Sequence, residues 1–219
     1  MNGQSVFGGP RMVETPFPNP EGRPGPSFVT RMRAKRAMDL AISVPALVLL
    51  LPVFAIVSLA IWLDSRGSAV FRQRRVGKNE ELYTLYKFRT MFVGTPNVAT
   101  AEVGKLARSP ITRVGAFLRR ASIDELPQLV NVVRGEMSLV GPRPALPSQE
   151  NVNRLRREAG VEALLPGITG WAQINGRDEL GDAEKVAYDA EYLRRQSLGF
   201  DLLILVRTFN PVVTGKGNR

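Results

Sequence analysis

The longest apolar stretch of the chain runs from Leu40 to Leu63 and contains no charged residue. At a rise of about 1.5 Å per residue, a helix of this length reaches across a hydrocarbon core of roughly 30 Å. Pro45 and Pro52 lie inside the stretch, and a proline within a helix removes a hydrogen bond and tends to kink the helix. The pattern therefore predicts either one membrane-spanning helix or a helix–break–helix that bends at Pro52 and returns to the same face.

Basic residues flank this stretch on both sides. Four precede it and five follow it: Arg31, Arg33, Lys35 and Arg36, then Arg66, Arg72, Arg74, Arg75 and Lys78. A spanning helix normally has its basic cluster on the cytoplasmic side alone. A re-entrant hairpin over residues 31–66 would instead place both clusters against acidic headgroups of the cytoplasmic leaflet. From the residues alone, both topologies stay open.

The chain on either side of this segment differs in character. Residues 1–30 are rich in proline and glycine with little apolar periodicity, which predicts a disordered or extended leader. This leader lacks the order of a signal peptide. Residues 67–215 are polar enough to form a soluble domain.

Periodicity within the domain indicates mostly helices. Alternation over 70–77 and 81–90 predicts a short β-hairpin around Gly77-Lys-Asn-Glu80. Helices are expected over 111–120, 149–159, 182–196 and 200–209, the last in the core or in the membrane interface plane. Ser122 is the expected N-cap of another helix, with a buried face made of Leu126, Leu129, Val130 and Val133. The fold class predicted is α-dominated α+β.

Composition narrows the chemistry that the chain can perform. With no His and no Cys, imidazole bases, thiol nucleophiles and zinc sites built from these ligands are excluded. Carboxylates, hydroxyls, Lys, Arg or a hard metal ion must supply any reactive group. The net charge of +10 predicts an anionic partner: nucleic acid, acidic lipid or a phosphorylated substrate.

The strongest candidate for chemistry is the pair Asp124-Glu125. Adjacent carboxylates repel each other, so ionising both favours a cation beside them. Arg119 and Arg120 precede the pair. A structural alternative is a capping box, in which the Glu125 side chain returns to the Ser122 amide.

Three further sequence features surround this pair. Gly141-Pro-Arg-Pro144 and Pro166–Arg177 are glycine- and proline-rich turns that carry Arg143 and Arg177, and guanidinium groups bind phosphate in a bidentate manner. Lys87 and Arg89 share one face of the second expected strand. This face contacts either solvent or a diphosphate.

The motifs taken in order resemble those of the bacterial sugar transferases, the monotopic polyisoprenyl-phosphate phosphoglycosyl transferases. They are Lys87-Phe-Arg-Thr90, Asp124-Glu-Leu-Pro-Gln128, Met137–Pro144 and Pro166–Gly170, and the resemblance covers roughly residues 31–215. It implies transfer of a sugar 1-phosphate from a UDP-sugar to polyprenyl phosphate, usually undecaprenyl phosphate, with release of UMP. The product would start a surface glycan at the cytoplasmic face of the bacterial inner membrane.

The resemblance also implies roles for individual residues. Asp124 would be the nucleophile that forms a covalent phosphosugar intermediate, and Asp124 and Glu125 would bind Mg²⁺. Arg119 and Arg177 match family positions that contact phosphate. Lys87 matches the lysine of a family motif.

The resemblance further implies a re-entrant helix–break–helix. Relatives often have Ser-Pro at the break, whereas this chain has Leu51-Pro52. A Ser hydroxyl can satisfy a carbonyl freed by the kink, and Leu cannot.

Two alternatives are compatible with parts of this pattern. A non-catalytic, membrane-tethered basic module that binds acidic lipid or nucleic acid explains the charge and the apolar run, but not a carboxylate pair among arginines. A ternary-complex enzyme would use Asp124 as a metal ligand without a covalent step.

The favoured partners are a UDP-sugar, a polyprenyl phosphate and membrane lipids, without nucleic acid. No motif distinguishes glucose, galactose and N-acetylated sugars, and a homodimer is compatible with the sequence.

Overall fold

The structure, a computed structural model, describes residues 26–95, 109–176 and 179–214. Most of the expected leader, residues 1–25, and Arg177 lie outside the described residues. Helices dominate the fold, as predicted, and the first of them begins at Pro26, earlier than the expected start at residue 31.

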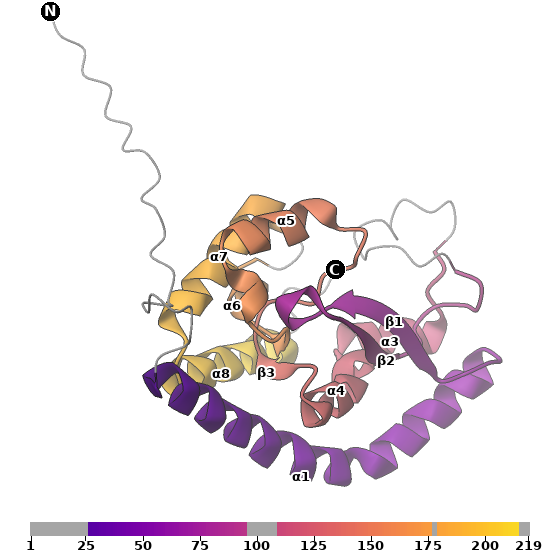
Figure 1. The fold of residues 1–219 in the computed structure, drawn as a ribbon. Coiled ribbons are helices and arrows are strands. Elements are labelled where there is room, and N and C mark those ends of the chain that lie inside the picture. The colour runs from indigo at the N-terminus through magenta and orange to yellow at the C-terminus, as the bar shows by residue number, and fades with distance from the viewer. Residues whose placement is uncertain (1–25, 96–108, 177–178, 215–219) are drawn as a thin grey trace, which may run out of the picture.

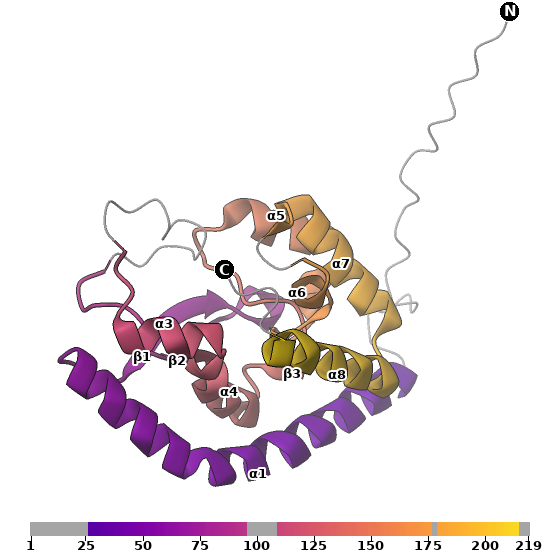
Figure 2. The same cartoon turned by 180° about the vertical axis from the view of Figure 1, so that it is seen from behind.

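The apolar stretch forms one continuous helix, α1 (Pro26–Asp64), with both prolines inside it. Figures 1 and 2 show α1 bent into an arc whose two ends lie towards the rest of the protein. The predicted break at Pro52 does not interrupt the helix, which is continuous and curved instead (Figure 1). Each proline removes a single backbone donor, and the surrounding hydrogen bonds carry the helix through. Among the described helices, α1 alone is long and apolar enough to cross a membrane, judged by length and composition.

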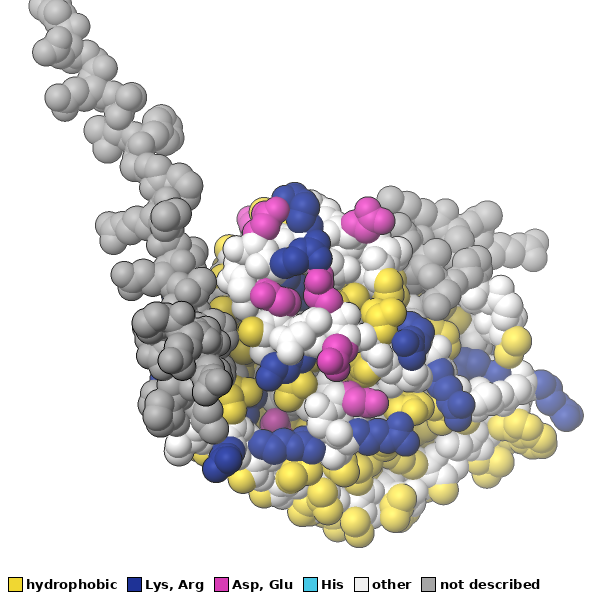
Figure 3. Space-filling view, viewed as in Figure 1, with side chains coloured by type: hydrophobic (Ala, Val, Ile, Leu, Met, Phe, Trp, Pro, Cys, Tyr) yellow, Lys and Arg dark blue, Asp and Glu magenta, His cyan; other side chains and the backbone are white. Residues whose placement is uncertain are grey.

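The outer side of α1 is strongly apolar. Figure 3 shows hydrophobic side chains along the edge formed by α1, with Lys and Arg side chains in a row beside them. The exposed large side chains are Ile42, Val44, Val48, Leu49, Leu51, Val53, Ile56, Leu59, Trp62 and Leu63. Val57 and Ile61 face inward and are buried against Phe88 and Leu118. A core helix of a soluble protein would not leave this much apolar surface exposed.

The predicted hairpin is confirmed. Strand β1 (Val70–Val76) pairs antiparallel with β2 (Leu82–Phe88), from Val70 opposite Phe88 to Val76 opposite Leu82. The connection is the short 3₁₀ turn η1 (Lys78–Glu80). Tyr83 and Leu85 of β2 are buried in the main core.

The helix expected before residue 120 is confirmed as α3 (Arg113–Arg120), whose N-terminus is capped by Thr112. The helix expected from Ser122 is wrong in its first half, which is the 3₁₀ segment η2 (Ile123–Gln128) followed by α4 (Leu129–Arg134). Ser122 has φ 55° and makes no side-chain cap bond to η2, so the capping box is also wrong. Pro127 inside η2 lacks the N–H that a regular α-helix needs there.

Sequence periodicity missed a second small sheet. Strand β3 (Ser138–Val140) pairs in parallel with β4 (Gly167–Thr169). Three residues are too few to show a period of two, so such strands are invisible in the pattern. The helices predicted over 149–159 and 182–196 are confirmed to within one residue as α5 (Glu150–Glu158) and α7 (Asp182–Arg195). The helix predicted over 200–209 is the longer α8 (Leu198–Thr214). The short elements η3 (Val161–Ala163) and α6 (Trp171–Ile174) were not predicted.

Helix α8 takes the core position, one of the two expected for it, along one of its faces. Phe200 and Ile204 are buried in the main core with Tyr192 of α7. Its other face exposes the large apolar side chains Leu198, Leu202, Leu203 and Val206. One side of α8 therefore packs in the core, and the other adds to the apolar surface of the protein.

Two of the basic residues assigned to lipid headgroups turn inward instead. The Lys35 ammonium forms a buried ion pair with Asp201 at 2.8 Å, and Tyr192 donates its hydroxyl proton to the same carboxylate at 2.7 Å. Arg36 donates to the backbone oxygens of Val132 and Val133 at the end of α4. A buried charge is tolerated only when it is paired, so these cations must keep their partners. Since the partners lie in α8 and α4, the contacts hold the N-terminal half of α1 against the domain.

Candidate active site

The carboxylate of Glu125 lies at the centre of a cluster of cations. Lys87 of β2 donates to Glu125 Oε1 at 2.7 Å, and the Arg143 guanidinium lies 3.6 Å from the same oxygen. Lys87 and Glu125 are each about one fifth exposed, whereas Arg143 is 41% exposed. Three distant segments of the sequence thus meet at one partly open site.

Two glycine turns lock together to place Arg143. Gly141 N–H donates to Thr169 O and Gly167 N–H donates to Pro142 O, each at 2.8 Å. The backbones approach so closely that a Cβ on Gly167 would lie 2.1 Å from the Gly141 nitrogen. Glycine is required at this crossing because no side chain fits between the two turns. The two turns identified in the sequence therefore form one rigid unit.

Asp124 belongs to the same electrostatic cluster. Its pKa is raised to about 6, mainly by burial and then by the neighbouring Glu125 charge, against the lowering effect of Lys87, Arg119 and Arg143. Burial disfavours the charged form of a carboxyl, and a like charge does the same. Ionisation of Asp124 is consequently less favourable than that of an ordinary aspartate. A cation that binds beside it would favour the ionised form.

Arg75 and Gln128 are site residues that sequence reasoning missed. Both line a small cavity beside Glu125, whose full lining is Arg75, Leu85, Lys87, Glu125, Gln128, Arg143, Pro144, Gly167 and Ile168. In the sequence Arg75 belongs to the basic flank of the apolar run. Its pKa is lowered to about 10, mainly by burial and then by Arg143. Alternation along β1 could have revealed it, because Gln73 and Arg75 share the face that turns inward.

The prediction that Arg89 binds phosphate does not fit the structure. Arg89 is buried, and its guanidinium donates to the backbone oxygens of Ser65 and Arg66 and to the Ser65 hydroxyl. Its charge therefore caps the C-terminal end of α1, where carbonyl groups lack helical partners. Lys87, two residues earlier, points to Glu125 instead.

We expect Arg89→Gln to lower the free energy of unfolding by about 2 kcal/mol, because several hydrogen bonds to buried carbonyls are lost. Affinity for a phosphate-bearing ligand should stay unchanged. Thermal unfolding in micelles and UDP binding measure the two quantities. Arg74→Gln, on an exposed position of β1, is the matched control and should change neither. Weaker UDP binding in the Arg89 variant at unchanged stability would restore its assignment as a phosphate ligand.

Asp124 and Glu125 are oxygen donors of the type that Mg²⁺ prefers. No group of three or more His, Cys, Asp or Glu side chains that could hold a metal ion occurs within the described residues. Magnesium in phosphoryl-transfer sites is usually bound by one or two carboxylates together with substrate phosphates and water. The residues present fit this arrangement and not a cage made of protein groups alone.

Comparison with known proteins gives close relatives. An undecaprenyl-phosphate glucose phosphotransferase of Komagataeibacter xylinus is 44% identical over 189 residues, which are 81% of this chain and 35% of that protein. A UDP-glucose:undecaprenyl-phosphate glucose-1-phosphate transferase of Escherichia coli is 42% identical over 182 residues, 80% of this chain and 39% of that protein. The chain thus spans less than half the length of these two relatives.

A third relative matches over nearly its whole length. The exopolysaccharide production protein ExoY of Rhizobium meliloti is 36% identical over 224 residues, which cover 95% of this chain and 97% of ExoY. The family model described as bacterial sugar transferase matches residues 30–215, which include all but the first four residues of the long apolar helix and every element of the site. The chain belongs to the bacterial sugar transferase family.

Proposed function

We propose that the protein transfers a sugar 1-phosphate from a UDP-sugar to a polyprenyl phosphate, such as undecaprenyl phosphate, and releases UMP. The observation that carries this proposal is the carboxylate pair Asp124-Glu125 held among Lys87, Arg119 and Arg143. A diphosphate donor and a phosphate acceptor both need charge neutralisation, which this cluster supplies. The two relatives named for glucose phosphate transfer make UDP-glucose the first donor to test.

In the proposed mechanism the Asp124 carboxylate attacks the β-phosphorus of the donor. The bond between that phosphorus and the bridging oxygen breaks, and UMP leaves with the electron pair. The sugar phosphate is then an acyl phosphate on Asp124. An oxygen of polyprenyl phosphate attacks the same phosphorus, restores the carboxylate and forms the polyprenyl diphosphate sugar.

The other groups of the site act on charge and position. In this proposal Arg143, which is 41% exposed, contacts the donor phosphates, and Lys87, which is paired with Glu125, holds that carboxylate in orientation. Both cations also oppose the negative charge that grows on the leaving phosphate. Mg²⁺ held by Asp124 and Glu125 would neutralise further phosphate charge when it is bound.

We propose further that α1 enters one leaflet and returns, with the catalytic domain on the cytoplasmic face of the inner membrane. Support comes from the arc of α1, from its exposed apolar outer side, and from the basic residues beside that side (Figure 3). The exposed apolar face of α8 would lie in the interface plane. Cysteine labelling at positions 38 and 65, from one side of sealed vesicles, tests this topology. Reaction of the two positions from opposite sides would contradict it.

The raised pKa of Asp124 predicts a pH dependence. Because the nucleophile must be ionised, kcat/KM should fall about tenfold per pH unit below about pH 6 and level off above it. Burial and Glu125 raise the pKa of Asp124, while Lys87, Arg119 and Arg143 lower it. Glu125→Gln should therefore shift the inflection to lower pH. If kcat/KM does not change with pH through this range, the ionisation of Asp124 does not control the rate, which contradicts its role as the nucleophile.

The reaction is tested by UMP release from a panel of UDP-sugars, with purified protein in micelles, Mg²⁺ and undecaprenyl phosphate. We expect release from one donor or a few, dependent on both Mg²⁺ and the acceptor. The competing function, a basic module that binds polyanions, predicts no UMP release from any donor. It predicts instead binding to nucleic acid or acidic vesicles that weakens steeply as salt rises.

A further inference from the structure

The turn that carries Arg143 has little conformational freedom of its own. Pro142 and Pro144 flank Arg143, and each proline ring fixes its own φ and restricts the residue before it. The direction of the Arg143 Cα–Cβ bond is then set largely by the orientation of the Arg143 peptide group. Whatever holds the Arg143 carbonyl consequently fixes the point and the direction from which the guanidinium reaches into the site.

A buried ion pair on the far side of the turn holds that carbonyl. Arg156 of α5 donates from one guanidinium nitrogen to Arg143 O at 2.9 Å. It donates from its other two nitrogens to Asp189 Oδ2 of α7, at 3.0 and 2.7 Å. The Asp189 side chain is 2% exposed and that of Arg156 is 13% exposed. One planar fork therefore connects α7 to the peptide group of Arg143.

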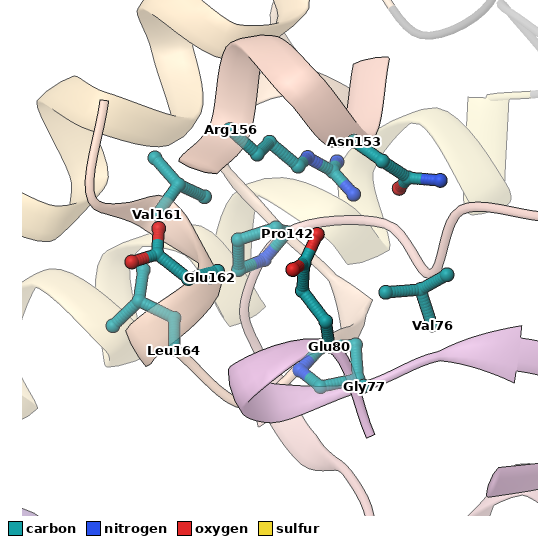
Figure 4. Close-up of a pocket in the computed structure, with 10 residues that line it drawn as sticks. Val76, Gly77, Glu80, Pro142, Asn153, Arg156, Val161, Glu162 and Leu164 are labelled. Atoms are coloured by element: carbon teal, nitrogen blue, oxygen red, sulfur yellow. The ribbon is translucent and has the colours of Figure 1, made fainter. Parts of the chain in front are cut away.

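Both packing and hydrogen bonds hold the turn on this side. Pro142 is buried, and together with Leu164 it lines a cavity of about 30 Å³. In Figure 4 the Arg156 side chain lies above Pro142, with Asn153 beside it. Arg75 adds a second hydrogen bond to the turn, at the next carbonyl, Pro144 O, at 3.0 Å.

We propose that Arg156 and Asp189 are positioning residues that aim the Arg143 guanidinium at the donor diphosphate. The inference rests on the proposed function, because it concerns the same site. Neither residue contacts the carboxylate pair in the structure, and Arg156 acts through the Arg143 carbonyl. Small displacements of a positioning group can cost on the order of 10²-fold in rate, so a loss of this one bond is measurable.

The pair also stabilises the fold, which the test must separate from positioning. Removal of one partner alone leaves an unpaired buried charge, which strongly destabilises a fold. Arg156→Lys avoids this, because it keeps a positive charge opposite Asp189 but lacks the planar fork that reaches two acceptors. The double variant Arg156→Met with Asp189→Leu removes the pair without leaving a charge unpaired.

The experiment is a double-mutant cycle between Arg156→Lys and Arg143→Ala, with UDP affinity and kcat/KM for UMP release as readouts. We expect Arg156→Lys to weaken both by about tenfold in the wild-type background, and by less than about twofold when Arg143 is already Ala. The melting temperature should fall equally in the two backgrounds. Arg154→Lys, whose exposed ion pair with Glu158 lies on the same helix, is the control and should change neither readout.

Equal losses from Arg156→Lys in both backgrounds would overturn the inference, since a general structural effect is additive. Wild-type affinity in the Arg156→Met, Asp189→Leu double variant would overturn it as well. A wild-type protein that binds no UDP and releases no UMP would instead overturn the proposed function, and the inference with it. Wild-type activity combined with an additive cycle rejects the positioning role alone.

Discussion

Replacement of Asp124 by Asn should lower turnover by roughly 10⁴-fold or more, the scale of loss seen when an enzyme loses its covalent nucleophile. An amide cannot attack the β-phosphorus to form the acyl phosphate. The fold should persist, because the raised pKa of Asp124 means that the structure disfavours the charged carboxylate over a neutral group. We therefore expect a melting temperature equal to or above that of the wild type.

The covalent step gives this variant a specific assay. If the sugar phosphate resides on Asp124, labelled UMP should exchange into the UDP-sugar without any acceptor, and Asp124→Asn should abolish the exchange. Asp182→Asn is a matched control, because Asp182 accepts a bond from Asn151 at the protein surface. Wild-type protein that turns over only with acceptor present and never exchanges UMP would favour a ternary complex, with Asp124 as a metal ligand.

Gly167→Ala should prevent formation of the site and destabilise the protein by more than about 3 kcal/mol, as forced overpacking of a rigid backbone does. The added Cβ would lie 2.1 Å from the Gly141 nitrogen and 2.4 Å from Thr169 O. Backbone atoms cannot rotate away as a flexible side chain can. The two turns must separate, and the hydrogen bonds between Gly167, Pro142, Gly141 and Thr169 are lost with them.

The measurement is the yield of folded protein and its melting temperature in micelles. Gly199→Ala is the matched control, because a Cβ at Gly199 in α8 meets no atom within 4 Å. Alanine also has the higher helix propensity, so we expect that variant to melt within a few degrees of the wild type or above it. Normal stability of the Gly167 variant would show that the turns need not lie in contact.

Much of the fold was predictable because its longer elements have clear periods. The hairpin 70–88 alternates along both strands, and α7 and α5 are long enough for a helical pattern to show. The parallel pair β3–β4 depends on contact between two turns far apart in the sequence. No local pattern encodes this contact, although the glycines at 141 and 167 mark its position.

The charged residues show a similar division. The order of motifs placed Asp124, Glu125, Lys87 and Arg143 in one hypothesis, and the structure brings these four together. Charge alone could not show that Lys35, Arg36 and Arg89 bind internal carboxylate or carbonyl oxygens. An arginine on a surface and an arginine that caps a helix look the same in a sequence. Their difference lies in tertiary contacts.

The most direct test of the central claim follows the β-phosphorus of the donor. Purified protein would be incubated with UDP-glucose labelled at that phosphorus, Mg²⁺ and undecaprenyl phosphate, in parallel with other UDP-sugars. The account predicts that the label moves with the sugar into the lipid fraction as a diphosphate-linked product, while unlabelled UMP appears in equal amount. Sugar in the lipid fraction without the label, or label released with UDP, would show glycosyl transfer and contradict the account.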